Sequence, residues 1–153
     1  MATVERTAEI IWNGSVARGA GMASGASGAL RDLPLTAASR LGEPEGKTSP
    51  EELIAAAHAG CFTMALGSIL AGRGTPPERL DVSARVTLET SGVPTITSSV
   101  LDVHGVVPGS DQEAFDTAAH EAERSCPVSR ALQGNVEMRV DATLDARPTI
   151  SVA

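Results

Sequence analysis

The segment from Leu53 to Ala71 contains no Asp, Glu, Lys or Arg, and it constrains the fold more than any other part of the chain. Its start carries the signals of a helix N-terminus. Ser49 suits the N-cap, Pro50 suits the first helical position, and Glu52 completes a capping box with Ser49. Gly72 favours a stop just after the apolar run. The sequence therefore predicts one long, mostly apolar helix.

This helix is long enough to span a bilayer, so a membrane location has to be weighed. Its strongly apolar side chains favour insertion by only roughly 2 to 4 kcal/mol in total, and His58, Thr63 and Ser68 oppose it. We therefore expect a buried core helix and no membrane partner. The residues expected on its buried stripe follow helical spacing: Leu53, Ala57, Cys61, Met64 and Ser68.

Strand signals lie on both sides of the helix. Before it, Asn13-Gly14 predicts a hairpin turn between strands over residues 4–12 and 15–23. A third short strand is expected over 28–31, followed by a long polar loop over 32–48. After the helix, alternating apolar residues predict a strand over 80–88 and a partner over 95–107.

The C-terminal part adds two helices and one strand. A helix is expected over 111–124, a short one from Pro127, and a strand over 136–144. The predicted order is β-β-β-α-β-β-α-α-β. Hairpins outnumber βαβ crossovers in this order, which indicates an α+β fold with largely antiparallel sheets. We expect one domain over residues 1–153.

Composition excludes several functions. The net charge is −7 and no Lys/Arg cluster occurs, which argues against a nucleic-acid partner. The N-terminus has no apolar stretch of the secretory type, so we expect a cytoplasmic protein. In a reducing compartment, a pair of cysteines is more often redox-active than structural.

The chain has two cysteines, and the sequence around each suggests a different environment. Cys61 lies within the apolar helix, where a thiol is often a small core residue. Cys126 precedes Pro127, which places it at or beside the N-cap of the short helix. Free N–H groups and the helix dipole there would lower the pKa of its thiol.

The segments Pro50–Leu66 and Cys126-Pro127-Val128-Ser129 together resemble the OsmC/Ohr family of organic hydroperoxide reductases. The Trp12-Asn13-Gly14 hairpin and the long loop before the helix fit the same family. The chain is similar to the OsmC branch through Ala57-His58-Ala59 and the arginine that precedes the helix. Leu41 departs from the aromatic residue that often follows this arginine.

The resemblance implies a two-cysteine peroxidase without metal, haem or flavin. Cys61 would attack an organic hydroperoxide, or hydrogen peroxide, and become a sulfenic acid. Cys126 would resolve it to a disulfide, which an external dithiol of the lipoyl type would reduce. Arg40 would stabilise the thiolate with Glu51 holding it in place, and Arg18 is the alternative arginine.

Glu51 precedes Cys61 by ten residues on the predicted helix, an axial distance of about 15 Å. A straight helix cannot bring Glu51 to the Cys61 of its own chain. If both serve one site, an antiparallel crossing of two helices near Ala56 would supply Glu51 from a second subunit. We therefore expect an intertwined homodimer with sites at its interface. Alternatively, Glu51 is simply a first-turn acid favoured by the helix dipole.

Other interpretations stay open. The apolar helix face with Leu53, Phe62 and Met64 suggests a pocket for alkyl peroxides. His58, one turn before Cys61, could be a general base or a hydrogen-bonded structural residue. A metal site formed by Cys61, His58 and Cys126 with His104 or His120 matches no usual zinc spacing. The chain could also be a non-enzymatic module that binds an apolar ligand or senses oxidant, or a cysteine hydrolase.

Overall fold

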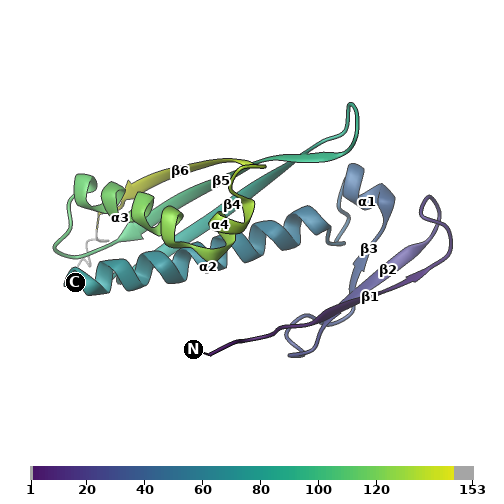
Figure 1. Ribbon diagram of the computed structural model, residues 1–153, viewed down its shortest axis with the longest axis horizontal. Helices are drawn as coiled ribbons and strands as arrows, with labels where there is room; N and C mark the ends of the chain where they lie inside the picture. Colours follow the sequence, from purple (N-terminus) through teal and green to yellow (C-terminus); the bar gives the residue numbers. More distant parts are fainter. Residues whose placement is uncertain (1, 147–153) are drawn as a thin grey trace, which may run out of the picture. The chain divides into compact units, whose positions relative to one another are not determined.

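The computed structural model describes residues 2–146, and Figure 1 shows their helices and strands. The chain divides into two compact units, Met1–Leu53 and Ile54–Ala153, and each is described separately below. The single domain expected over 1–153 stays a prediction. Its ends, Met1 and residues 147–153, lie outside the described residues.

The first unit is built on an antiparallel sheet of three strands. They are β1 (Ala8–Asn13), β2 (Ala20–Gly25) and β3 (Leu33–Leu35), in the order β1-β2-β3. The predicted hairpin is confirmed, with Asn13 opposite Ala20. Its connection runs over residues 14–19, so the expected two-residue turn is wrong. Gly14 leaves the strand at a φ of +88°, a conformation that favours glycine.

Two short elements of this unit differ from the prediction. The third strand is β3 rather than residues 28–31, and helix α1 (Ala37–Leu41) occupies part of the expected loop over 32–48. Pro34 is tolerated in β3 because this strand lies at the edge of the sheet. Thr36 caps α1 by accepting from the Ser39 N–H at 3.0 Å, and Ser39 Oγ accepts from the Thr36 N–H. This capping box has serine at the position where the usual pattern Ser/Thr-x-x-Glu has Glu, so the start of α1 was not recognised in the sequence.

Helix α2 (Pro50–Gly72) begins and ends as predicted. The Glu52 N–H donates to Ser49 Oγ at 3.1 Å, as expected of an N-cap. Within the described residues, α2 is the one helix whose length and composition would allow it to cross a membrane. Only 22% of its most apolar window is buried inside the chain, so much apolar surface of α2 remains uncovered.

The second unit contains a sheet of strands β4 (Arg79–Glu89), β5 (Thr95–Val106) and β6 (Glu137–Leu144), in that order. Strands β4 and β5 are antiparallel, as predicted, but β6 lies parallel to β5. Helices α3 (Gln112–Ser125) and α4 (Pro127–Leu132) form the crossover that a parallel pair requires. The resulting α+β architecture has two small sheets and one long helix.

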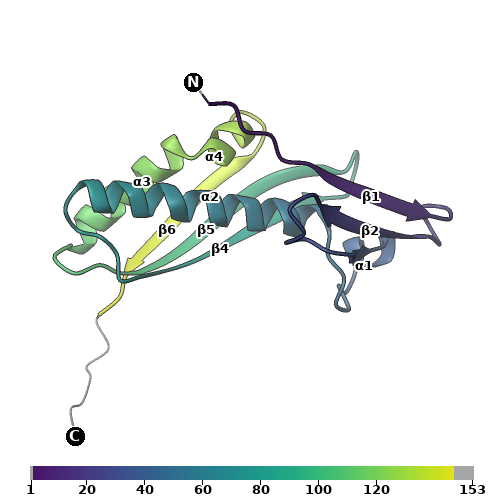
Figure 2. The same ribbon diagram turned by 90° about the horizontal axis from the view of Figure 1, so that it is seen from below.

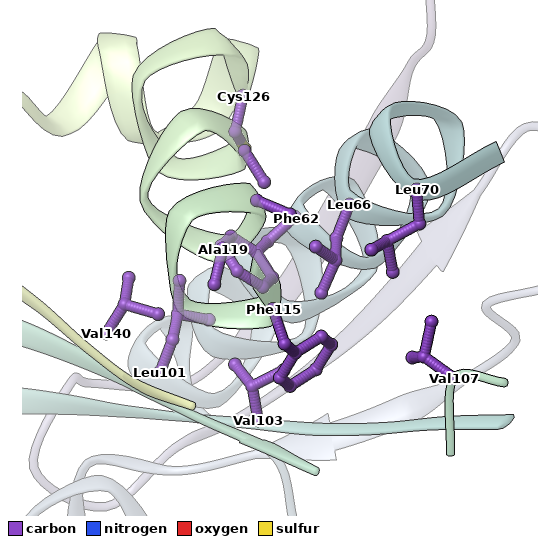
Figure 3. Close-up of a cluster of buried hydrophobic side chains, with 12 residues drawn as sticks. Phe62, Leu66, Leu70, Leu101, Val103, Val107, Phe115, Ala119, Cys126 and Val140 are labelled. Atoms are coloured by element: carbon purple, nitrogen blue, oxygen red, sulfur yellow. The ribbon is translucent and has the colours of Figure 1, made fainter. Parts of the chain in front are cut away.

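Helices α2 and α3 lie against one face of this sheet (Figures 1 and 2). Between them, Phe62 and Leu66 of α2 meet Phe115 of α3 and Leu101 and Val103 of β5, all at most 1% exposed (Figure 3). A Cβ on Gly105 would come within 2.5 Å of the Phe115 ring, so only glycine leaves room for this ring.

The buried stripe of α2 differs from the predicted one. It consists of residues spaced by four: His58, Phe62, Leu66 and Leu70. Met64 is 72% exposed, and Ala57 and Ser68 are also exposed. The prediction failed because α2 is apolar on all sides, so its periodicity does not single out one face.

Candidate active site

The second unit brings the two cysteines together from positions far apart in the sequence. Cys61 lies in α2 and is half-buried, whereas Cys126 is fully buried at the N-cap of α4. Both are free thiols, and their side chains are hydrogen-bonded to each other. The second unit thus holds two thiols near each other, one of them partly open to solvent.

The start of α4 supplies hydrogen-bond donors to both sulfurs. Pro127 is the first helical residue and has no N–H, so the first free amides are those of Val128 and Ser129. The Ser129 N–H donates to Cys126 Sγ at 3.5 Å. The Val128 N–H donates to Cys61. The predicted N-cap position of Cys126 is confirmed.

The pKa values of the two thiols are shifted in opposite directions. Burial raises the pKa of Cys61 above its usual value, although the Val128 N–H works against this. Burial also opposes ionisation of Cys126, but donors from the Ser129 backbone, the Ser129 hydroxyl and Cys61 outweigh it and lower the pKa of Cys126. Within the second unit, Cys126 is therefore the more acidic thiol, as its N-cap position predicted.

His58 lies at the centre of a buried polar chain. Its Nδ1 is 2.7 Å from Ser99 Oγ on β5, and its Nε2 is 2.8 Å from Ser129 Oγ on α4. All three side chains are at most 1% exposed. Burial lowers the pKa of His58, so the ring is neutral near neutral pH. The interpretation of His58 as a hydrogen-bonded residue is confirmed, and its partners are Ser99 and Ser129.

Sequence reasoning missed Ser99 and Ser129 as site residues. They lie 41 and 71 residues from His58 along the chain, and Ser99 sits in a strand with no local signal for a polar contact. Ser129 carried a weak signal, since it is the third residue after the N-cap Cys126 and so faces the cap side chain.

The first unit contains a separate charged pair, Arg40 and Glu51. Arg40 Nη2 lies 2.6 Å from Glu51 Oε1, and Arg40 Nε is 3.1 Å from both carboxylate oxygens. Burial alone would raise the pKa of Glu51, but hydrogen bonds from Arg40 and the backbone lower it below its usual value. Glu51 thus fixes the Arg40 guanidinium at the start of α2. Arg18 lies in the connection between β1 and β2 and is exposed.

Two other expectations can be compared with the structure. Phe62 lies in the hydrophobic core and Met64 is 72% exposed, so these two side chains lie on different faces of α2, and the predicted pocket for alkyl peroxides stays a prediction. His104 Nδ1 pairs with Asp145 at 3.2 Å. Within residues 2–146, no three His, Cys, Asp or Glu side chains gather closely enough to hold a metal ion.

Comparisons with known proteins identify the family of the chain. Residues 42–141 match the family model described as OsmC-like protein. The chain belongs to the OsmC/Ohr family. It is 37% identical over 137 residues to Peroxiredoxin OsmC of Escherichia coli, covering 89% of this chain and 95% of that protein. It is 31% identical over 112 residues to an organic hydroperoxide resistance protein of Xanthomonas axonopodis, covering 70% and 75%.

Solved structures support the same OsmC-like fold. The organic hydroperoxide resistance protein OhrB of Bacillus subtilis matches with a TM-score of 0.70 at 25% identity, covering 90% of this chain and 98% of that chain. The OsmC protein of Legionella pneumophila matches with a TM-score of 0.73 at 24% identity, covering 94% and 99%. The sequence resemblance to this family is therefore confirmed.

Proposed function

We propose that this protein is a thiol-dependent peroxidase that reduces organic hydroperoxides in the cytoplasm. The observation that carries the proposal is the proximity of Cys61 and Cys126, with Cys61 partly open and Cys126 closed to solvent. The names of the relatives, which include a peroxiredoxin and a hydroperoxide resistance protein, point to the same chemistry.

The proposed cycle uses the two thiols in sequence. The Cys61 thiolate attacks the terminal peroxide oxygen, the O–O bond breaks, and the alkoxide takes a proton to leave as an alcohol. Cys61 is then a sulfenic acid. Cys126 attacks its sulfur, an S–S bond forms, and hydroxide leaves and becomes water. An external dithiol, such as a lipoyl group, reduces the disulfide.

Accessibility favours Cys61 as the first nucleophile, although Cys126 is the more acidic thiol within the second unit. A peroxide has to reach the sulfur that it oxidises, and Cys126 is 0% exposed. A guanidinium beside Cys61 would lower the pKa of its thiol. We assign this role to Arg40, held by Glu51, and keep Arg18 as the alternative.

The Arg40–Glu51 pair acts, in this proposal, on the Cys61 of a second copy of the chain. Glu51 and Cys61 are ten residues apart along α2, about 15 Å of helix rise. The uncovered surface of α2 suits close contact with another helix, because Ala56 and Gly60 are exposed and a Cβ on Gly60 would meet nothing within 4 Å. An intertwined homodimer would bury this apolar surface.

Sedimentation across protein concentrations tests the dimer. We expect a dimer at micromolar concentration, and an active monomer there would contradict the cross-chain site. The Ala56→Leu substitution should weaken association and peroxidase activity together, since it crowds the expected helix crossing. Ala131→Leu, at an exposed position of α4, is the matched control and should change neither.

Turnover of cumene hydroperoxide with dihydrolipoamide tests the reaction. Cys61→Ser should abolish turnover. Cys126→Ser should allow one reduction per subunit without recycling through a disulfide. Arg40→Met should lower the rate strongly and Arg18→Met should not. Intact mass after one equivalent of peroxide should show the loss of two hydrogens per subunit.

Two results would overturn the assignment. A wild-type protein that consumes no peroxide would favour the alternative, a non-enzymatic module that senses oxidant or binds an apolar ligand. Alkylation with limiting iodoacetamide should label Cys61 first, and preferential labelling of Cys126 would reverse the roles of the two thiols.

A further inference from the structure

A polar chain runs through the second unit from β5 to the buried thiol. It passes from Ser99 to His58 at 2.7 Å, from His58 to Ser129 at 2.8 Å, and from the Ser129 hydroxyl to Cys126. The four groups come from β5, α2 and α4, so the chain forms only when this unit is folded. It ends on the sulfur that the proposed function assigns to disulfide closure.

Burial of these side chains needs an explanation. Three fully buried polar residues are costly unless each is hydrogen-bonded, and apolar residues of similar size often serve as well in a core. His58 lies at a position equivalent to Phe62, Leu66 and Leu70 on the buried stripe of α2. A hydrophobic residue there would continue the core. The polar chain therefore points to a task beyond packing.

We propose that His58, acting through the Ser129 hydroxyl, takes up the proton of Cys126 when this thiol closes the disulfide. This inference rests on the proposed peroxidase cycle. Both ring nitrogens of His58 already face hydroxyl oxygens, so a proton can move along the chain without any movement of the backbone. His58 touches Ser129 rather than either sulfur, and it is thus a positioning and relay residue.

The proton balance is complete within the site. Before closure Cys126 is a thiol, and in the tautomer that the relay uses the neutral His58 ring donates Nδ1–H to Ser99 and accepts the Ser129 hydroxyl proton at Nε2. Ser129 Oγ then accepts from the Cys126 thiol, and the hydroxyl turns to donate to this sulfur only when it is a thiolate. As the Cys126 sulfur attacks Cys61, its proton passes to Ser129 Oγ while the Ser129 proton passes to His58. The S–O bond of the Cys61 sulfenic acid breaks, and hydroxide leaves with the electron pair. The proton then returns from His58 to Ser129 Oγ, and the Ser129 hydroxyl gives its proton to the hydroxide, which becomes water.

Ser99 is the hydrogen-bond partner of His58 Nδ1 in the proposed relay. An imidazole in a buried site carries a second proton only briefly, since burial disfavours its charged form. In the relay, Ser99 Oγ accepts from Nδ1–H, and this tautomer leaves Nε2 free to accept from Ser129. Its place in the central strand β5 holds this acceptor still.

The first test needs no peroxide, so it separates the relay from the proposed function. In a Cys61→Ser background, Cys126 is the one remaining thiol, and the ultraviolet absorbance of its thiolate is followed against pH. His58→Gln and Ser129→Ala should each raise the midpoint and slow alkylation of Cys126 by about tenfold, as expected for the loss of a hydrogen bond to a charged group. His120→Gln, at an exposed histidine of α3, should change neither.

The second test follows the disulfide itself. After one equivalent of cumene hydroperoxide, quenched samples are analysed by mass spectrometry for the Cys61 sulfenic acid and for the disulfide. His58→Gln should leave the rate of sulfenic acid formation unchanged and slow disulfide closure by about a hundredfold. Ser129→Thr, which keeps the hydroxyl, should restore closure that Ser129→Ala loses.

The outcomes are decisive in both directions. If folded His58→Gln and Ser129→Ala proteins keep the wild-type midpoint and closure rate, the relay is wrong and the chain is purely structural. If His58→Gln does not fold, Ser129→Ala and Ser99→Ala carry the test, because each removes a single oxygen. If the wild type forms no sulfenic acid, the peroxidase proposal fails while the titration of Cys126 still decides the relay.

Discussion

The two units of the chain differ in how much apolar surface they bury. The second unit holds a continuous core of twelve buried residues shared by α2, α3, β5 and neighbouring elements (Figure 3). In the first unit, Ile10 and Ile11 of β1 are 52% and 60% exposed, and Met22 of β2 is 44% exposed. The second unit is thus stabilised by its own packing, whereas the sheet of the first unit keeps several large apolar side chains exposed.

The largest expected effect is on stability, and it distinguishes the core of the second unit from strand β1 of the first. Phe62→Ala should lower the free energy of unfolding by about 3–5 kcal/mol, because it empties a fully buried site. Ile11→Ala should change it by less than about 0.5 kcal/mol if β1 is open to solvent. Urea unfolding measures both. A loss at Ile11 that approaches the loss at Phe62 would indicate that β1 is covered in solution, which would sharpen the case for the homodimer.

A smaller effect is expected where the core meets the sheet backbone. Gly105→Ala should cost about 1–3 kcal/mol, since the new methyl group would force the Phe115 ring to move. Gly92→Ala, at a position where a Cβ meets nothing within 4 Å, is the control. Thermal unfolding of the two variants gives the comparison. Equal melting temperatures would mean that the core of the second unit is looser than its packing indicates.

A pH effect of intermediate size should arise from the buried His58. Its pKa in the folded protein is lowered from 6.5, so below that pH the unfolded chain binds a proton that the folded chain does not. Stability should therefore fall as the pH drops, by at most about 1.4 kcal/mol per pH unit. His58→Gln should remove this slope and His120→Gln should keep it, as followed by urea midpoints. An unchanged slope in His58→Gln would contradict the buried neutral ring.

The smallest effect is expected in the first unit. Glu51→Gln removes an ion pair whose arginine is 39% exposed, so it should cost only about 0.2–1 kcal/mol. The folded pKa of Glu51 lies below 4.5, so this stabilisation is present above that pH and lost as the pH falls through the folded pKa. Peroxidase activity should fall far more than stability does. Equal, small effects on both would argue against a catalytic role for the Arg40–Glu51 pair.

Local signals predicted much of the fold. The alternation in β4 and β6 and the capping residues of α2 and α4 depend on neighbours in sequence, and all four elements are where they were expected. Strand β3 and helix α1 were missed because each is short and lies among turn-forming residues. The buried face of α2 was wrong because its side chains are apolar all round, and only tertiary contacts decide which of them are covered.

In the candidate site, too, local sequence signals predicted some features and tertiary contacts decided the others. The N-cap position of Cys126 follows from Pro127 alone, so the sequence was sufficient for it. The contact of Cys126 with Cys61 was suggested by family resemblance, since no local pattern links residues so distant. The two serines that hold His58 could not be predicted, because their partnership depends on how β5, α2 and α4 pack.

The backbone amides in the first turn of α4 can stabilise a negative charge on either sulfur. The Val128 amide faces both cysteines and the Ser129 amide faces Cys126, so a negative charge on either sulfur finds a donor already in place. When a reductant opens a disulfide here, whichever sulfur is released as the leaving group would be solvated by the backbone at once. The same two amides would thus donate hydrogen bonds to the thiolate both when the disulfide forms and when it is reduced, as water does for a thiolate at a protein surface.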